Sequence, residues 1–437
     1  MANRPFREAG AVLTSLAAFM AVAVPADSAL GADPRPAAVS PHEQCFQGTF
    51  QLSRPTAEQR IAACSNALQS DKMTEHEVAL AHLNRGVARM EMGDKVLASV
   101  DYQEALNHYE GLIDSKDPDA LALYRRGVSL DGLGQTDRAL SSFDEAIKRS
   151  PKEPRAFFER GVLLATRKRA YDRAISDFNR VLELAPGDVD AMIRRGDAYG
   201  QMGDFGHALA DLDRAVSLAP DYARAYIFRG LTNSRRKENE RAAADFDAAL
   251  KIDPRNIDGL VNRAALYAGD HREDLAIDDL TTAIAIQKNN PFAFYNRGYA
   301  YFARGDYKLA IDDYSVAIGL DPAMALAYNN RCLTRTIAGI DLVPALADCA
   351  TALKMMPTNL DVRITRGFIH LKLGDLTTAI VEYNAVLAAD PNRALALYGR
   401  GMARNRMNQE KEGEADQAAA RALDPTVEKQ FSTYGVN

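Results

Sequence analysis

Residues 291–322 read PFAFYNRGYAYFARGDYKLAIDDYSVAIGLDP, and this stretch determines how most of the chain folds. In its first half, Phe294, Gly298 and Tyr301 recur at intervals of four and three, which places them on one face of a helix. Gly305 then follows, and glycine readily takes the left-handed conformation that ends a helix. The first half therefore predicts a helix, here called helix A, that ends in a tight turn.

The second half of the same stretch predicts another helix. Ala310, Tyr314 and Ala317 again follow one another at intervals of four and three. Pro322 closes the pattern, because a proline disfavours helical geometry at the residue before it. We call this second element helix B, and the stretch as a whole predicts one helix–turn–helix unit.

This unit recurs along the chain, and an arginine followed by a small residue marks its register. The arginines are Arg85, Arg126, Arg160, Arg195, Arg229, Arg263, Arg297, Arg331, Arg366 and Arg400. Their spacing is 34 or 35 residues, except for a first gap of 41. A fixed period of this size indicates stacked units that are each too small to bury their own apolar face.

The layout resembles the tetratricopeptide repeat (TPR) family. Its small positions match Gly298, Ala310 and Ala317, its large positions match Phe294, Tyr301 and Tyr314, and its closing proline matches Pro322. The resemblance covers residues 79–425 in ten units, preceded by a degenerate leading repeat over residues 45–78. It implies an all-α, right-handed superhelical solenoid in which helix A lines the concave groove.

The ten arginines are expected to belong to the framework. Sixteen or seventeen residues after them stand Asp101, Ser142, Asp177, Asp211, Asp245, Asp279, Asp313, Asp348, Glu382 and Asp416. We infer an ion pair between helix A and helix B in each unit, because the planar guanidinium suits a carboxylate. The second unit has Ser142 instead of an acid, so its helix pairing is expected to be weaker.

The first residues have the pattern of a targeting segment. Arg4 and Arg7 precede an uncharged apolar run over residues 9–24, which is typical of a signal peptide and short for a membrane span of about 20 residues. We predict a signal peptide over 1–32, a proline-rich tether over 33–44 and a C-terminal tail over 426–437. Export would make the protein periplasmic or secreted, and a retained membrane anchor is the less favoured alternative.

Four cysteines in an exported chain suggest disulfides. Cys45 and Cys64 flank the leading repeat, where a bond would pin the tether to the first helix; two free thiols are the alternative. Cys332 and Cys349 follow Arg331 and Asp348 directly, so their sulfurs should lie close together. There a buried pair of free cysteines remains open, because cysteine is also a common small apolar filler.

Nothing in the sequence points to catalysis. The seven histidines lack metal-ligand spacing, and phosphate-binding loops and nucleophile-elbow patterns are absent. We therefore expect no enzyme activity, no catalytic residue, no metal and no cofactor. The net charge of −6 gives no basic footprint for nucleic acid, so nucleic acid is not an expected partner.

Aromatic and asparagine side chains gather on helix A of the seventh unit and its neighbours. The predicted partner-binding residues are Phe292, Tyr295, Asn296, Tyr299, Phe302, Asn330 and Phe368. Aromatic rings give large contact areas, and asparagines can pair with an extended peptide backbone. The alternative is that the aromatics pack against the next unit.

The sequence thus predicts an exported scaffold or adaptor that binds a protein or peptide in the groove of the solenoid. The alternative function is a non-catalytic accessory or carrier subunit that binds polysaccharide for an envelope enzyme complex.

Overall fold

The computed structural model describes residues 45–46, 56–70, 72–113 and 119–433, and within them every regular element is a helix, α3 to α24. The predicted signal peptide and tether lie outside these residues. The chain divides at Pro254 into two compact units, which we call the N-terminal body (residues 45–254) and the C-terminal body (residues 255–433). None of the described helices is both long and apolar enough to cross a membrane.

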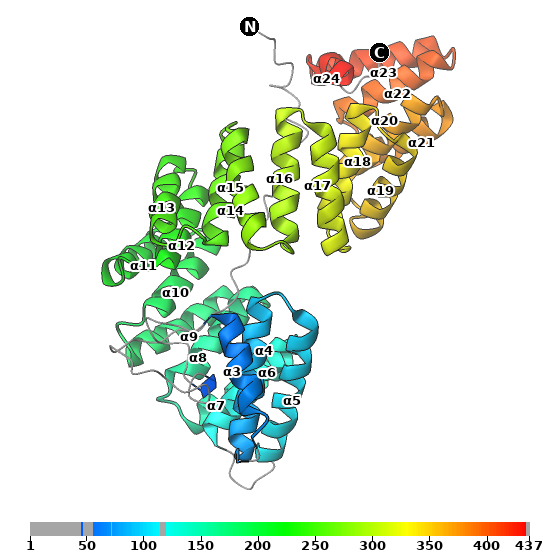
Figure 1. Ribbon diagram of the computed structural model, residues 1–437. Helices are drawn as coiled ribbons and strands as arrows, with labels where there is room; N and C mark the ends of the chain where they lie inside the picture. The colour runs from blue at the N-terminus through cyan, green and yellow to red at the C-terminus, as the bar shows by residue number, and fades with distance from the viewer. Residues whose placement is uncertain (1–44, 47–55, 71, 114–118, 434–437) are drawn as a thin grey trace. The chain divides into compact units, whose positions relative to one another are not determined.

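In the N-terminal body, each helix A packs against the helix B that follows it, and the short helix α3 packs against α4 (Figure 1). The helices A are α4 (Glu75–Glu91), α6 (Ala120–Gly132), α8 (Pro154–Thr166), α10 (Val189–Gln201) and α12 (Ala223–Arg235). The helices B are α3 (Ala57–Ala67), α5 (Lys95–Ile113), α7 (Thr136–Arg149), α9 (Tyr171–Leu184), α11 (Phe205–Leu218) and α13 (Asn239–Ile252).

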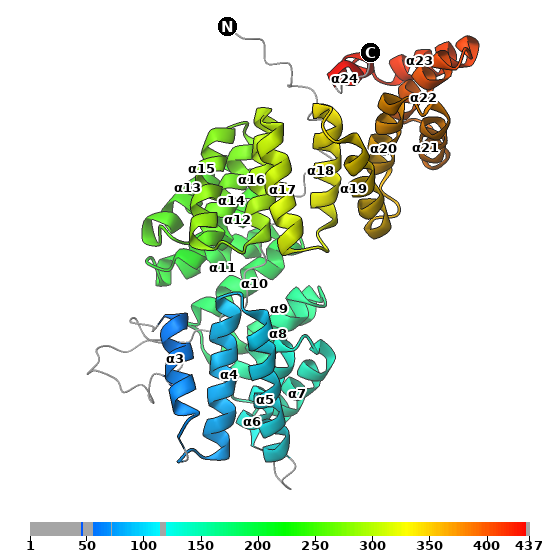
Figure 2. The same ribbon diagram turned by 45° about the vertical axis from the view of Figure 1, so that its right-hand side comes forward.

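The C-terminal body repeats the same pairing five times and adds one short helix, as a second view shows (Figure 2). The helices A are α14 (Ile257–Gly269), α16 (Pro291–Arg304), α18 (Ala325–Ala338), α20 (Leu360–Leu373) and α22 (Ala394–Arg406). The helices B are α15 (Glu273–Ile286), α17 (Tyr307–Leu320), α19 (Leu342–Met355), α21 (Leu376–Ala389) and α23 (Glu410–Leu423). Helix α24 (Val427–Thr433) lies within the segment predicted as a tail. The predicted all-α stack of two-helix repeats is confirmed.

A left-handed residue forms the turn between helix A and helix B in every unit. Six units use a glycine with positive φ: Gly93, Gly134, Gly203, Gly305, Gly339 and Gly374. The other four place Arg169, Lys237, His271 or Asn408 in the same conformation. A non-glycine residue in this region carries a local conformational cost, so the two packed helices impose the turn on these sequences.

Inside a unit, a small residue on helix A faces a large one on helix B. A glycine faces an aromatic ring in six pairs: Gly86–Tyr102, Gly127–Phe143, Gly161–Phe178, Gly230–Phe246, Gly298–Tyr314 and Gly367–Tyr383. The approach is closest at Gly127, where an added Cβ would lie 2.5 Å from Cε1 of Phe143. The absence of a side chain at this position therefore sets how closely the two helices can pack.

Replacing Gly127 with alanine is expected to lower the free energy of unfolding by about 1–3 kcal/mol, since the new methyl group overlaps the buried ring of Phe143. Gly111, on the exposed side of α5, is the matched control because a Cβ there meets no atom within 4 Å. Gly111→Ala should instead raise stability by about 0.5–1 kcal/mol through helix propensity. Urea denaturation followed by circular dichroism measures the free energy of unfolding of both variants. A change of that free energy in the same direction for both would contradict the packing argument.

The predicted contacts between the arginine of helix A and its partner on helix B, which we call clasps, are present. In the seventh unit, Arg297 donates from Nε and Nη2 to the two carboxylate oxygens of Asp313, at 2.7 and 2.8 Å. Seven other units make the same two-point contact with an aspartate, whereas Arg366 reaches Glu382 through Nη2 alone. In the second unit Arg126 donates to the Ser142 hydroxyl at 2.9 Å and pairs with the exposed Glu145 at 3.1 Å, so this unit lacks the buried carboxylate of the others, and the weaker helix pairing stays a prediction.

The arginines also join one unit to the next, which the sequence analysis missed. Nη1 of Arg297 donates to Thr281 on the preceding helix B, sixteen residues upstream, at 3.1 Å. The same step of sixteen residues recurs in five further pairs: Arg160–Asp144, Arg195–Asn179, Arg229–Asp213, Arg331–Ser315 and Arg400–Asn384. Each of these guanidinium groups therefore ties three helices together.

Candidate functional site

Five of the seven residues predicted to bind a partner are buried. Tyr295, Asn296, Phe302, Asn330 and Phe368 are each at most 8% exposed. The other two, Phe292 and Tyr299 on α16, are half-buried. All five of the aromatic side chains belong to or pack against one hydrophobic cluster of the C-terminal body.

Contacts between neighbouring helices explain this burial. The ring of Tyr295 packs against Tyr314 with centroids 5.9 Å apart, and its hydroxyl accepts a hydrogen bond from Nδ2 of Asn330 at 3.1 Å. Burial raises the pKa of Tyr295 above its usual value, so the hydroxyl stays neutral. Phe302 packs against Tyr307 at 5.7 Å. Tyr295, Phe302 and Asn330 thus pack within the stack, which is the alternative interpretation given above. The Asn330 amide bonds to Tyr295, although we expected it to face a peptide backbone.

A smaller surface remains on α16, formed by the half-buried side chains of Phe292 and Tyr299, with the buried Asn296 between them in the sequence; we call these three residues the α16 face. These residues share one side of the helix because they are spaced by four and three. The Nδ2 atom of Asn296 is buried and has no hydrogen-bond partner among the described residues. Burial, with a smaller effect from Glu273, raises the pKa of Tyr299. The α16 face therefore combines two half-buried rings with an amide donor that the fold leaves unpaired.

The N-terminal body carries a cluster of charged side chains at the corresponding positions of α10 and α12. The Tyr222 hydroxyl donates to Asp190 at 3.0 Å, and Arg224 donates to the same carboxylate at 3.4 Å. The guanidinium groups of Arg194 and Arg224 lie 5.6 and 5.7 Å from the ring centroid of Phe228. Burial, followed by the repulsion from Arg224, lowers the pKa of Arg194 to about 10. The helix A faces of the two bodies thus differ, one being charged and the other aromatic.

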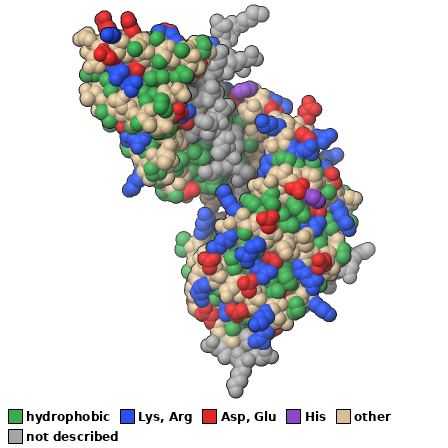
Figure 3. All heavy atoms as spheres, turned by 180° about the vertical axis from the view of Figure 1, so that it is seen from behind, with side chains coloured by type: hydrophobic (Ala, Val, Ile, Leu, Met, Phe, Trp, Pro, Cys, Tyr) green, Lys and Arg blue, Asp and Glu red, His purple; other side chains and the backbone are tan. Residues whose placement is uncertain are grey.

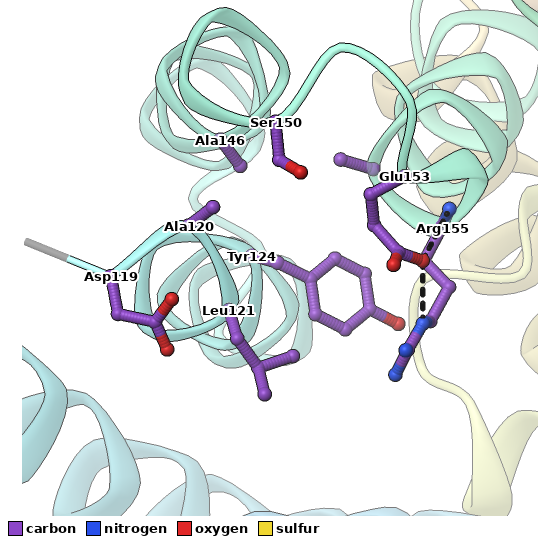
Figure 4. Close-up of a pocket in the computed structure, with 9 residues that line it drawn as sticks. Asp119, Ala120, Leu121, Tyr124, Ala146, Ser150, Glu153 and Arg155 are labelled. Carbon is purple, nitrogen blue, oxygen red and sulfur yellow. Dashed lines mark hydrogen bonds and ion pairs between the residues drawn. The ribbon is translucent and has the colours of Figure 1, made fainter.

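A pocket of about 190 Å³ lies where α6, the end of α7 and the start of α8 meet. It is lined by Asp119, Ala120, Leu121, Tyr124, Ala146, Ser150, Glu153, Arg155 and Ala156. Figure 4 shows the Tyr124 hydroxyl pointing toward the ion pair between Glu153 and Arg155, which spans 2.8 Å. This volume is below the roughly 300–1,000 Å³ of typical small-molecule sites, so the pocket suits a single side chain. The sequence analysis did not single out these residues.

Both cysteine pairs form disulfides. Cys45 bonds to Cys64 of α3, with Cα atoms 4.7 Å apart, and fixes residues 45–46 to that helix. Cys332 of α18 bonds to Cys349 of α19, with Cα atoms 5.6 Å apart. The second bond occupies the place of the glycine–aromatic contact that joins helix A to helix B in other units.

No catalytic constellation is evident in these surfaces. Among the described residues, no group of three or more His, Cys, Asp or Glu side chains is arranged to hold a metal ion. Cationic and acidic side chains are interspersed on the face drawn in Figure 3, and no continuous basic field covers it. The arrangement offers shape, aromatic contact area and hydrogen-bonding groups, which are the means of macromolecular recognition.

Curated relatives share only part of this chain. The protein called DnaJ homolog subfamily C member 3 is 28% identical over 115 residues in Homo sapiens and in Bos taurus, and 27% identical over 117 residues in Mus musculus. These matches cover 26% of this chain, which spans about a quarter (23%) of the length of the relatives.

Three solved structures that match this chain have TM-scores of 0.47 or below. A chain of the APC/C hetero-tetramer Cut9–Hcn1 has 14% identity and a TM-score of 0.47, covering 87% of this chain and 92% of that one. A tetratricopeptide repeat protein from Parabacteroides merdae has 19% identity and a TM-score of 0.46, covering 60% and 98%. Yeast Tom70 has 15% identity and a TM-score of 0.45, covering 86% and 88%.

Family models described as tetratricopeptide repeat match just over half of the chain. One matches residues 124–189, 193–257 and 365–428, and another matches residues 291–324. The matched segments contain the arginine register, the left-handed turns and the small–large packing pairs described above. The chain is therefore a member of the tetratricopeptide repeat family, whose stacked two-helix units serve as protein-interaction scaffolds.

Proposed function

We propose that the protein is an exported scaffold or adaptor that holds a protein or peptide partner against the helix A faces of its repeats. The α16 face carries this proposal. A buried donor without a partner costs about 1–3 kcal/mol, so the Nδ2 atom of Asn296, a residue that is 1% exposed, would gain from an acceptor supplied in trans once neighbouring side chains move to admit it. A backbone carbonyl of an extended peptide is such an acceptor.

The two rings beside Asn296 supply the apolar part of this contact. Phe292 and Tyr299 are half-buried, so their rings are held in place and still present area to a partner. Rigid aromatic side chains of this kind frequently dominate the binding energy of an interface. A peptide on the α16 face would pack its side chains against the rings while its backbone reaches the asparagine.

Export to the periplasm or the cell exterior fits the cysteine chemistry. Disulfides persist in oxidising compartments and are rare in the cytosol, and this structure contains two. The signal-peptide pattern of Arg4, Arg7 and the apolar run over 9–24 points to the same compartment. We therefore propose that the partner is a component of the envelope or the extracellular space.

The second candidate function is a carrier that binds polysaccharide. The half-buried rings of Phe292 and Tyr299 favour it, because aromatic faces can stack on the apolar faces of sugars. In this case the Asn296 amide would donate to a sugar hydroxyl. The two candidate functions use the same surface and differ in whether it binds a protein or a polysaccharide.

The test is affinity capture from an envelope fraction with the full chain as bait. The Phe292→Ala/Tyr299→Ala variant is expected to retain a specific protein partner at least ~10-fold less tightly than the wild type. Leu309→Ala, an exposed change on α17, is the matched control and should leave capture unchanged. Retention of glycan with no protein would favour the carrier. Equal capture by both variants, with unchanged helicity, would remove the α16 face from the proposal.

A further inference from the structure

The last described helix, α24, lies against α20 and α22. The ring centroid of Phe431 is 4.5 Å from that of Phe368 on α20 and 4.7 Å from that of Tyr398 on α22. Phe431 is 1% exposed, and Val427, one helical turn earlier, is fully buried. These two side chains form the apolar side of α24, whereas Glu428 and Ser432 are exposed. Phe368, predicted to contact a partner, is thus covered by the chain itself.

This placement departs from the register of the repeats. In the C-terminal body, each helix A contacts the helix A of the adjacent unit, as α18 does α20 and α20 does α22. Helix α24 begins shortly after Pro425, where helix A of a further unit would begin. Phe431 nevertheless reaches α20, two helices A earlier. Helix α24 therefore folds over the helix A faces of its own body and does not simply extend the stack.

The contacts of α24 with the rest of the C-terminal body include two buried apolar side chains and one exposed ion pair. A helix of seven residues has little stability of its own in water. Gln430 donates to Asp424 and Thr426, which belong to its own segment. The ion pair of Glu428 with Arg421 is exposed on both sides, at 3.4 Å. Burial of Val427 and Phe431 supplies the apolar part of the attachment of α24, and short segments held by local contacts open readily.

We propose that the surface formed by Phe368 and Tyr398, which we call the α20–α22 site, is a docking site for a short amphipathic helix of a protein partner. Helix α24 occupies the site as an internal ligand, and a partner helix displaces it. The inference rests on the proposed scaffold function and specifies the chemistry of one partner segment. The template is α24: an aliphatic residue, an acidic residue immediately after it, and an aromatic residue one turn beyond the first.

The acidic position has a physical basis in Arg421. Its guanidinium lies 5.8 Å from the ring centroid of Tyr398 and pairs with Glu428. When α24 leaves, this cation stays at the edge of the α20–α22 site. A partner helix with Asp or Glu after its aliphatic anchor restores the ion pair, and a basic residue there would be repelled.

The test uses the full chain and a fluorescent synthetic peptide with the sequence of residues 424–437. Phe431→Ala removes the internal ligand, so this variant is expected to bind the peptide at least ~10-fold more tightly than the wild-type chain, whose site is occupied. Ser432→Ala, at the exposed neighbouring position, should bind as weakly as the wild type. A peptide that itself carries the Phe431→Ala change should not bind either variant. Fluorescence anisotropy measures all six combinations of the three chains with the two peptides.

Equal binding by wild type and Phe431→Ala, or no binding by either, would overturn the proposal, because α24 would then be an integral cap. Hydrogen exchange on the wild type gives an independent reading that needs no variant. Amides of α24 should exchange at least ~100-fold faster than those of α20 and α22 if α24 opens alone. Equal protection contradicts the proposal. Failure here leaves the partner capture on the α16 face untouched, so the two proposals are tested separately.

Discussion

Replacing Asp313 with leucine is expected to lower the free energy of unfolding by about 3–5 kcal/mol, one of the two largest effects predicted for this chain. Asp313 is the buried carboxylate that Arg297 grips with two hydrogen bonds. The guanidinium is also held between the rings of Phe294 and Tyr301, at 5.6 and 5.7 Å from their centroids. Arginine cannot give up its proton, so the variant keeps a partly buried cation without its carboxylate.

The reverse change, Arg297→Leu, is expected to cost less, about 1–3 kcal/mol, because a carboxyl group can take up a proton. Burial already raises the pKa of Asp313, and Arg297 acts against that rise. Without Arg297 the pKa rises further above the value of an unfolded chain. The folded variant then binds more protons than the unfolded one, so its stability increases as pH falls through the raised pKa.

Denaturation at pH 7 and pH 5 separates the two variants. The loss caused by Arg297→Leu should shrink at the lower pH, whereas the loss caused by Asp313→Leu should persist. The double variant should recover part of the Asp313→Leu loss, since no unpaired charge remains. Val316→Ala, exposed on the same helix, is the control for a general effect on α17. Equal losses that do not change with pH would contradict the clasp as an ion pair.

Removing the disulfide between Cys332 and Cys349 is expected to lower stability by about 3 kcal/mol, the usual value for a loop of this length. In a body of about 180 residues this corresponds to about 6–12 °C in Tm. The double variant Cys332→Ala/Cys349→Ala measures the loss by calorimetry. Before that, alkylation of the unfolded, unreduced chain should label no cysteine, and labelling of Cys332 or Cys349 would contradict the prediction.

A packing control accompanies the alanine variant. Cys332→Gly/Cys349→Tyr introduces the glycine–aromatic pair that joins the two helices in the unit of Gly298 and Tyr314. It should recover part of the lost stability, because the ring fills the space that alanine leaves empty. If it proves less stable than the alanine variant, the disulfide and the glycine–aromatic contact are not equivalent solutions to the same packing problem.

The framework of this protein could be predicted because its rules repeat. The distance from Arg297 to Asp313 follows from helix geometry and a constant turn, so the register of arginines was enough to pair helix A with helix B. The contact from Arg297 back to Thr281 has an equally regular spacing and could have been found by comparing polar residues sixteen positions upstream. The left-handed conformation of Lys237 and His271 could not have been found in this way, because the neighbouring helices impose it against local preference.

The candidate sites were less predictable, because they depend on how closely neighbouring units approach. Counting positions along helix A placed Tyr295 and Asn330 on a binding surface, but the two side chains bond to each other across the interface between units. Asp190 and Arg224 form a cluster through the same kind of contact. Helix α24 was missed because seven residues give too short a pattern to reveal the face that Val427 and Phe431 share.

The step of sixteen residues on either side of an arginine has a consequence for how such a chain can change its length. The same arginine makes the contact within a unit and the contact between two units. It bonds to a carboxylate sixteen or seventeen residues downstream in its own unit and to a polar oxygen sixteen residues upstream in the preceding unit. A segment of one full period copied in frame brings its own arginine, its own acid and an acceptor for the arginine that follows. Gain or loss of a whole period therefore creates no new kind of junction. An insertion of another length preserves the pairing only where it falls in a turn or a loop, as in the 17-residue steps of Arg160 and Arg331 and the first gap of 41 residues.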